Sequence, residues 1–319
     1  MTPDFFPRHS FYCLLDDQPD YLVPTHLIEQ RNGHGDLTVN PQCWFAWNGP
    51  LPPAMAARAG STAGFYDMPW MVWVEDAGTH ALLPFWLGPE YARALHEMRP
   101  GEPPGVELPE NISQVLQAAQ ILVEPDHAAR RRKQYLDAVQ HYSALFSRGF
   151  VALPALLHPF HIGALRRYYR YHTRAGSFTL GDGQTPGRYV AHNESVTNFF
   201  QRQLNTVISD IARTLVKPSY SYLALYQGGA ELNRHVDREQ CEYSVTLCID
   251  ATPEPAAQVP WPLQLGTGDG ELRVWQHVGE ALFYRGRYLP HWRDRLADGY
   301  TSSSMLLHYV DIDFAGKLA

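Results

Sequence analysis

The sequence predicts an α+β protein with a mixed N-terminal domain over residues 1–149 and a jelly-roll core with buttressing helices over residues 150–319. Three observations predict this organisation. The length of 319 residues suits two domains. The composition changes near residue 150. After Pro218 the chain is strand-like to its end, and helices followed by a run of strands favour a β-sandwich or jelly roll.

The composition limits the classes of partner. Hydrophobic residues make up 45% of the chain and charged residues 18%, which allows a sizeable core. A net charge of -7 argues against nucleic acid as a partner. The first residues lack the pattern of a signal peptide, and the apolar runs are too short to span a membrane. We therefore expect a cytoplasmic protein with no membrane partner.

The four cysteines, Cys13, Cys43, Cys241 and Cys248, predict neither a zinc site nor a disulfide framework. None of them forms a CxxC pair, which a structural zinc site commonly uses. Four cysteines are also too few to form a disulfide framework in a chain of this length. Cys241 and Cys248 are instead expected to be small core residues on one pair of strands.

The N-terminal domain reads as short strands followed by helices. A strand is expected at 81–87 and helices at 88–98, 110–125 and 127–149. By pattern alone this order resembles the small winged-helix domains that bind leader peptides, and a helical cap on the following domain is the other interpretation. The resemblance implies a peptide or protein partner. The basic run Arg130–Lys133 is expected to be a solvated helix face.

The C-terminal domain begins with a strand at 149–157, a helix at 158–176 and a long amphipathic helix at 193–216. Asn193 or Ser195 is expected to cap the long helix. Three histidines of this region, His158, His161 and His172, have no acidic residue at ligand spacing and are expected to be structural. Strands are expected at 219–227, 241–250, 271–278, 280–286 and 302–313.

The segment NRHVDREQ carries a candidate metal site. His235 and Asp237 are two residues apart, and on a strand such residues point to the same face. With a second histidine they would form the two-histidine, one-carboxylate set that binds non-heme iron(II). His291 follows the apolar strand expected at 280–286 and is the candidate third ligand. A hydrogen-bonded His235–Asp237 pair beside a structural His291 is the alternative.

The segment LYQGGAELNRHVD is similar to the prolyl-hydroxylase-like branch of the iron(II)- and 2-oxoglutarate-dependent oxygenases. That branch places a tyrosine and a glycine-rich turn before HxD, and here these are Tyr226, Gly228, Gly229 and the pair His235 and Asp237. The segment EALFYRGRYLPH looks like the family's strand before its distal histidine. The resemblance covers roughly residues 150–319.

The resemblance implies a double-stranded β-helix, cupin-like core that binds Fe(II) through His235, Asp237 and His291. It implies 2-oxoglutarate as cosubstrate, with Tyr226 nearby, and O2 as oxidant, so that the catalytic outcome is a dioxygenase reaction releasing succinate and CO2. Halogenases of the superfamily carry Ala or Gly in place of the carboxylate ligand. Asp237 therefore favours hydroxylation or a related oxidation, and the substrate class is an amino acid, a peptide or a small metabolite.

The chain departs from the family at the cosubstrate pocket. The family places Arg or Lys about nine or ten residues after the distal histidine to pair with the far carboxylate. Tyr300 and Thr301 stand there in this sequence. We expect Arg293 or Arg295 to supply the cation, with hydroxyl groups from Thr301 and Ser303. Less favoured cations are Arg273, Arg285 and Arg287.

Two other functions fit parts of this pattern. His, Asp and His also bind zinc, and a zinc hydrolase would need a general base, for which Glu239 or Glu242 is available. The second alternative is a peptide-binding protein whose oxygenase domain is degenerate. Residues that flank the motif and are candidates for a substrate pocket are Arg234, Arg238, Glu239 and Tyr222.

Overall fold

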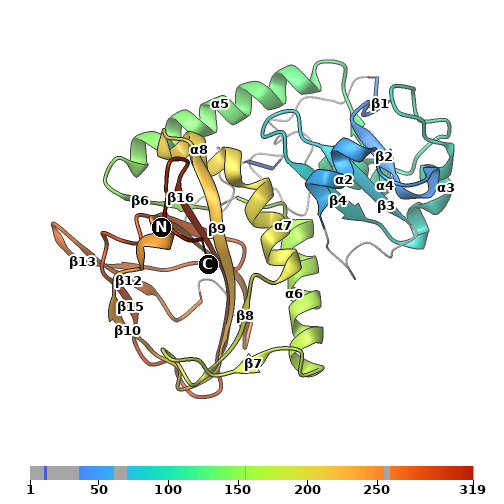
Figure 1. Ribbon diagram of the computed structural model, residues 1–319. Coiled ribbons are helices and arrows are strands. Elements are labelled where there is room, and N and C mark those ends of the chain that lie inside the picture. The colour runs from blue at the N-terminus through green and yellow to red at the C-terminus, as the bar shows by residue number, and fades with distance from the viewer. Residues whose placement is uncertain (1–10, 13–35, 61–69, 155, 255–258, 319) are drawn as a thin grey trace. The chain divides into compact units, whose positions relative to one another are not determined.

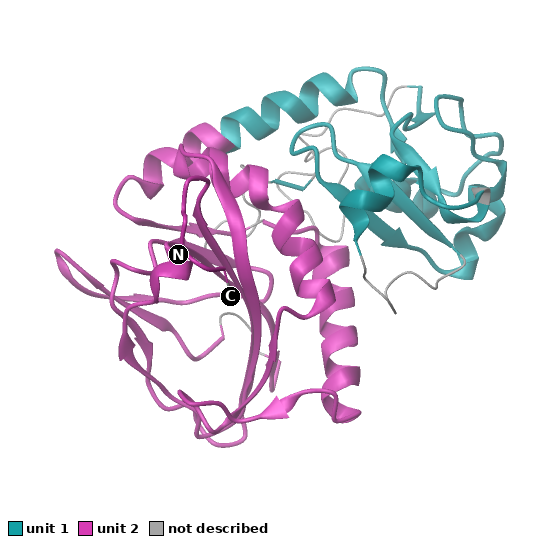
Figure 2. Cartoon of the chain, viewed as in Figure 1, with its two compact units in different colours: residues 1–138 teal, residues 139–319 magenta. Residues whose placement is uncertain are grey.

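The computed structural model describes residues 11–12, 36–60, 70–154, 156–254 and 259–318 (Figure 1). Most of the N-terminal stretch, including Cys13, lies outside these residues. The chain forms two compact units, residues 1–138 and 139–319 (Figure 2). The division falls within helix α5 (His127–Phe146), before the boundary expected at residue 150. The end of this helix belongs to the second unit because Phe146 stacks on Phe283, with ring centroids 4.2 Å apart.

The first unit contains short strands and short helices. Strands β2, β3 and β4 form an antiparallel sheet, and β1 pairs with β5. The winged-helix prediction is not confirmed by this arrangement. The elements are β1 (Thr38–Val39), β2 (Cys43–Phe45), η2 (Ala46–Asn48), α2 (Pro53–Ala59), β3 (Met71–Glu75), β4 (Leu82–Trp86), η3 (Pro89–Tyr91), α3 (Ala92–Glu97), α4 (Glu110–Ala118) and β5 (Leu122–Val123).

The basic run of α5 is not uniformly solvated, which corrects the sequence-based expectation. The Arg131 side chain is buried and donates from Nε to Oδ1 of the equally buried Asp76 at 2.9 Å, and from Nη2 to Oδ2 at 2.9 Å. Lys133 behaves as expected and pairs with Asp137 on the surface. A run of like charges on a helix therefore contains one residue that is internal to the first unit.

The second unit is built from two antiparallel sheets. One has seven strands in the order β6-β14-β11-β16-β9-β8-β7, and the other has four in the order β10-β15-β12-β13. This arrangement is consistent with the predicted jelly roll. The strands are β6 (Phe150–Leu153), β7 (Thr179–Leu180), β8 (Arg188–His192), β9 (Val216–Tyr226), β10 (Leu232–His235), β11 (Tyr243–Thr252), β12 (Leu263–Thr267), β13 (Gly270–Val274), β14 (Ala281–Tyr284), β15 (His291–Arg293) and β16 (Thr301–Asp311).

Helices α6 (Pro159–Arg174), α7 (Ser195–Gln203) and α8 (Asn205–Ala212) pack on the seven-stranded sheet, away from the four-stranded one (Figure 1). The single helix expected at 193–216 is divided at Leu204 into α7 and α8. Its cap is Glu194 rather than Asn193 or Ser195, because the Glu194 carboxylate accepts from the backbone N–H groups of Val196 and Thr197.

Burial is deepest on the central strands of the larger sheet. On β11 every residue except the last is buried, as a strand covered on both faces requires. The buried Cys241, in the short helix η4 (Glu239–Cys241), and Cys248 on β11 are free thiols, as is Cys43. Among the described residues, no helix is both long and apolar enough to cross a bilayer.

Candidate metal centre and cosubstrate pocket

His235 and His291 face each other across a pair of antiparallel strands. They are direct partners in the register of β10 and β15, and their ring centroids are 4.3 Å apart. Cross-strand partners on one face bring their side chains within contact. The strand pairing therefore places together two imidazoles that are far apart in the sequence.

Each of the two imidazole rings is held by a contact between its Nδ1 and the backbone carbonyl two residues earlier. Nδ1 of His235 lies 2.8 Å from the carbonyl oxygen of Asn233, and Nδ1 of His291 lies 2.9 Å from that of Leu289. A carbonyl only accepts, so Nδ1 carries the proton in each ring. This tautomer leaves Nε2 of both histidines with a lone pair, which is the form that binds a metal ion.

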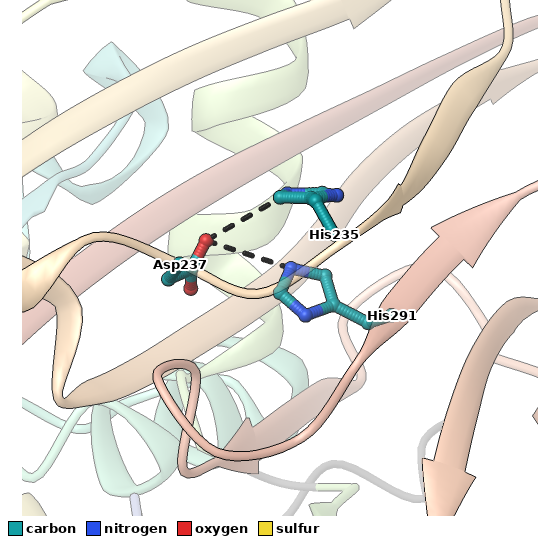
Figure 3. A group of neighbouring side chains, drawn as sticks. All are labelled: His235, Asp237 and His291. Atoms are coloured by element: carbon teal, nitrogen blue, oxygen red, sulfur yellow. Dashed lines mark ion pairs between the residues drawn. The ribbon is translucent and has the colours of Figure 1, made fainter.

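Asp237 completes the group (Figure 3). Its Oδ1 lies 3.8 Å from Nε2 of His235 and 3.5 Å from Nε2 of His291. Val236, the middle residue of the HxD motif, is 49% exposed, and β10 ends at His235. The structure thus brings together the three residues that the sequence predicts as ligands.

Three residues hold the Asp237 carboxylate in place. The Asp237 N–H donates to the carbonyl of Gly286 at 2.9 Å, and the Ser244 hydroxyl donates to Oδ2 at 2.7 Å. Nδ1 of the buried His308 lies 3.0 Å from the Ser244 oxygen. Because Ser244 donates its proton to Asp237, its oxygen accepts from His308. This chain of contacts leaves Oδ1 of Asp237 directed at the two histidines.

The electrostatics of the group favour metal binding. Burial opposes ionisation of Asp237, but its contacts with His291, His308 and Ser244 hold its pKa below the usual value. Burial and the neighbouring His291 lower the pKa of His235, and burial lowers the pKa of His308 to about 4. A carboxylate beside neutral imidazoles is the ligand state that a divalent cation requires.

The residues present fit a bound metal ion. Their donor atoms all lie within 4.8 Å of one another. Bonds of about 2.0–2.2 Å from a central ion allow ligand atoms to stand at such separations. Two imidazoles and a carboxylate match non-heme iron(II). Asp237 also belongs to a second group with Cys241 and His308, but burial raises the pKa of Cys241 to about 12, so it remains a thiol.

The three ligands open into a cavity of about 450 Å³ between the sheets. Such a volume suits a small molecule. Its walls combine four basic or acidic side chains outside the ligand group with an aromatic and aliphatic surface. Those lining residues are Asp182, Arg188, Arg238, Arg293, Tyr220, Tyr222, Tyr226, Tyr284, Leu232, Leu263 and Leu306.

Arg293 is buried in the wall of this cavity and, unlike the buried Arg188, has no described carboxylate partner. It lies two residues after His291 on β15 and therefore shares its face of the strand. Its guanidinium donates to the carbonyl of Trp261 at 2.5 Å and to Oε1 of Gln276 at 3.2 Å, and it lies 4.6 Å from the Trp261 ring centroid. Both acceptors are neutral. Among the described residues no carboxylate forms an ion pair with Arg293, and burial lowers its pKa.

Tyr226 borders the same cavity and is oriented by Arg188. Nη1 of Arg188 donates to the Tyr226 hydroxyl at 3.0 Å. Arg188 is itself neutralised by Asp182, which also accepts from the Tyr222 hydroxyl at 2.6 Å. Since the Tyr226 oxygen accepts from Arg188, its own proton is free to be donated to a ligand.

Thr301 and Ser303 do not line this cavity, which corrects the expectation that they would. They line a separate hollow beside α6, together with Arg166 and Arg170. Side chains alternate along a strand, so the neighbouring residue of β16, Ser304, faces the metal cavity instead. The Ser304 hydroxyl is buried and has no hydrogen-bond partner in the described structure.

The other candidate residues are placed less centrally. Arg295 is 57% exposed and pairs with Asp298, so it does not replace Arg293 as the buried cation. The cavity is lined by Arg238 and Tyr222, as expected for a substrate pocket. Residues that do not line it are Arg234, Glu239, Glu242, Arg273, Arg285 and Arg287.

The three histidines of residues 158–172 that the sequence predicts to be structural lie outside the metal group. His158 caps α6 by accepting from the N–H of Phe160 at 3.0 Å, and His172 lies 3.1 Å from the Ser177 hydroxyl. His161 is fully buried. None of the three belongs to a metal-binding group among the described residues.

No family model matches the sequence, and no curated protein sequence matches it. The chain is similar to solved structures of 2-oxoglutarate–Fe(II) oxygenases, prolyl hydroxylases among them. A prolyl-4-hydroxylase from Pseudomonas putida is 16% identical, with 54% of this chain and 98% of that chain covered and a TM-score of 0.44. A prolyl hydroxylase from Trichoplax adhaerens, in complex with a peptide fragment, is 15% identical, with 55% and 92% covered and a TM-score of 0.45.

A third similar structure is the alpha ketoglutarate dependent epimerase SnoN from nogalamycin biosynthesis. It is 12% identical, with 55% of this chain and 84% of that chain covered and a TM-score of 0.46. Likenesses this distant do not carry a function. The function of this chain has to be argued from its metal-binding group and cavity.

Proposed function

We propose that this chain is a non-heme Fe(II)- and 2-oxoglutarate-dependent dioxygenase with a double-stranded β-helix core. It would hydroxylate a C–H bond of an amino acid, a peptide or a small metabolite. One observation carries the proposal: His235, Asp237 and His291 converge with both Nε2 atoms unprotonated and with Oδ1 of Asp237 within 4 Å of each. When bound, Fe(II) with 2-oxoglutarate supplies O2 activation coupled to decarboxylation, which yields succinate and CO2.

Arg293 would anchor the far carboxylate of 2-oxoglutarate. A buried guanidinium without a counter-charge is costly, and an anionic ligand removes that cost. The guanidinium has five N–H groups, and two of its hydrogen bonds go to the neutral acceptors of Trp261 and Gln276. The remaining donors are available to a carboxylate. Tyr226 and Ser304, which line the same cavity, would add hydroxyl donors.

A zinc hydrolase receives less support. Its proposed general bases, Glu239 and Glu242, do not line the cavity. The carboxylate of Asp182 does, but it is engaged by Arg188 and Tyr222. A degenerate domain is also disfavoured. All three candidate ligands are present, both histidines have an unprotonated Nε2, and Ser244 holds the Asp237 carboxylate. A peptide- or protein-binding role for the N-terminal unit remains a proposal.

Turnover of 2-oxoglutarate after Fe(II) loading in the absence of O2 tests the proposal. On admission of O2, the wild-type protein should form succinate and CO2, and His235→Ala should form neither. His172→Ala is the matched control, because that histidine lies on α6 outside the metal group and should leave turnover unchanged. Full activity in His235→Ala, or purified protein that holds zinc and never consumes 2-oxoglutarate, would contradict the assignment.

A further inference from the structure

Arg238 directly follows Asp237 in the sequence. It lines the same cavity of about 450 Å³, and its guanidinium lies 5.4 Å from the Tyr220 ring centroid. That ring stacks on His192 at 5.0 Å and lies 4.6 Å from the ring of His308. An aromatic surface therefore supports the guanidinium at the side of the cavity.

Arg238 is exposed, and among the described residues no hydrogen bond or ion pair engages its guanidinium donors. The nearby Arg234 shows the contrast, because it is turned away from the cavity and pairs with Glu271 at 2.7 Å. A cation that opens into a ligand cavity without a partner is suited to bind an anion.

The charges expected with metal and cosubstrate bound also favour an anionic partner for Arg238. Asp182 neutralises Arg188, and the far carboxylate of 2-oxoglutarate would neutralise Arg293. A divalent metal ion would be balanced by Asp237 and the second carboxylate of the cosubstrate. Arg238 is the charge that stays uncompensated once metal and cosubstrate are in place.

We propose that Arg238 binds an anionic group, a carboxylate or a phosphate, on a small-molecule substrate. The inference rests on the proposed function and names the substrate class of the same cavity. The lining of the same cavity also includes the apolar side chains of Leu232, Val236 and Leu306. A substrate with an anionic head and an aliphatic body matches this surface, with the head fixed by Arg238 and the body directed towards the metal ligands.

Binding of three probes with similar aliphatic bodies tests this. N-acetyl-L-leucine, its carboxamide and isopentyl phosphate are titrated into protein loaded with Mn(II) and 2-oxoglutarate without O2, so that Arg293 is already occupied. Line broadening of the probe methyl protons by Mn(II) reports occupancy beside the metal. The wild-type protein should bind one of the anionic probes at least about tenfold more tightly than the carboxamide. The tighter anion identifies the head group.

Variants assign the effect to one residue. Arg238→Gln should abolish the preference for the anion while retaining Mn(II) and 2-oxoglutarate affinity, and Arg238→Lys should retain part of the preference. Arg234→Gln, the matched control on β10, should behave as wild type. Absence of a preference in the wild type, or its persistence in Arg238→Gln, overturns the inference alone. A wild-type protein that binds neither Mn(II) nor 2-oxoglutarate overturns the proposed function as well.

Discussion

A Cβ atom on Gly286 would lie 2.2 Å from Oδ2 of Asp237 and 2.5 Å from the hydroxyl of Ser244. Only glycine leaves room for the carboxylate to turn towards the two histidines. We therefore expect Gly286→Ala to displace Asp237 and to lower Mn(II) affinity by about ten- to a hundredfold, as loss of a contact that orients a metal ligand commonly does. Isothermal titration of the metal-free protein with Mn(II) measures this.

Gly268→Ala is the matched control for this substitution. A Cβ atom at Gly268 meets nothing within 4 Å, so Mn(II) affinity should not change. Wild-type affinity in Gly286→Ala would mean that Asp237 does not bind the metal from the position described here.

Arg293→Gln should weaken 2-oxoglutarate binding by more than about thirtyfold, because removing one partner of a buried charge pair commonly costs 2 kcal/mol or more. The variant should keep its Mn(II) affinity and its melting temperature without cosubstrate, since no described carboxylate pairs with Arg293. Equilibrium binding in the presence of Mn(II) and without O2 provides the measurement.

Arg295→Gln provides the comparison, because Arg295 is exposed and its ion pair with Asp298 lies on the surface. Equal losses in both variants would argue against a specific anchor at Arg293. A fall in stability confined to Arg293→Gln would instead indicate a structural role.

Ser304→Ala should lower 2-oxoglutarate affinity about fivefold, the loss expected for one hydrogen bond of about 1 kcal/mol. Its hydroxyl is buried, lines the cavity and has no protein partner, so a ligand is the acceptor that its removal would affect. Ser303→Ala, which alters the opposite face of β16, should leave the affinity unchanged. The reverse pattern would show that the serine originally predicted from the sequence is the correct one.

The sequence predicts the candidate ligand pair His235 and Asp237 because its signal is local. His235 and Asp237 are two residues apart at the end of β10, and Arg293 is placed beside His291 by the alternation of β15. Thr301 and Ser303 do not line the cavity of the metal group, because counting from His291 passes through a turn, which does not preserve alternation. The register of β16 against β9 and β11 sets which of its serines face inward.

Contacts that hold Asp237 were not predictable in this way. Ser244 contacts His308 because they are register partners of β11 and β16, and Gly286 lies beyond the end of β14. Nothing in the sequence around each residue indicates a contact with Asp237, and only the pairing of the strands brings these residues together. Arg131 illustrates the same limit, since nothing in a basic run distinguishes the one side chain that meets a buried Asp76.

Asp76→Asn should destabilise the first unit by about 3–5 kcal/mol, because it leaves the guanidinium of Arg131 buried without its counter-charge. Both side chains are almost completely buried, at 0% and 1% exposure. Urea denaturation at about pH 7 measures the difference. Asp137→Asn is the matched control, since its pair with Lys133 is exposed and should contribute under about 0.5 kcal/mol.

The effect of Asp76→Asn should depend on pH. Burial opposes ionisation of Asp76, but Arg131 and the contacts from Thr79 hold its pKa below the usual value. A group whose pKa is depressed by folding stabilises the folded state above its unfolded pKa, about 3.9 for aspartate, and loses that contribution as the pH falls through the folded value. The difference between wild type and variant should therefore be largest near neutral pH and should shrink below about pH 4. A difference that stays constant down to about pH 3 would mean that the carboxylate charge is not what stabilises this pair.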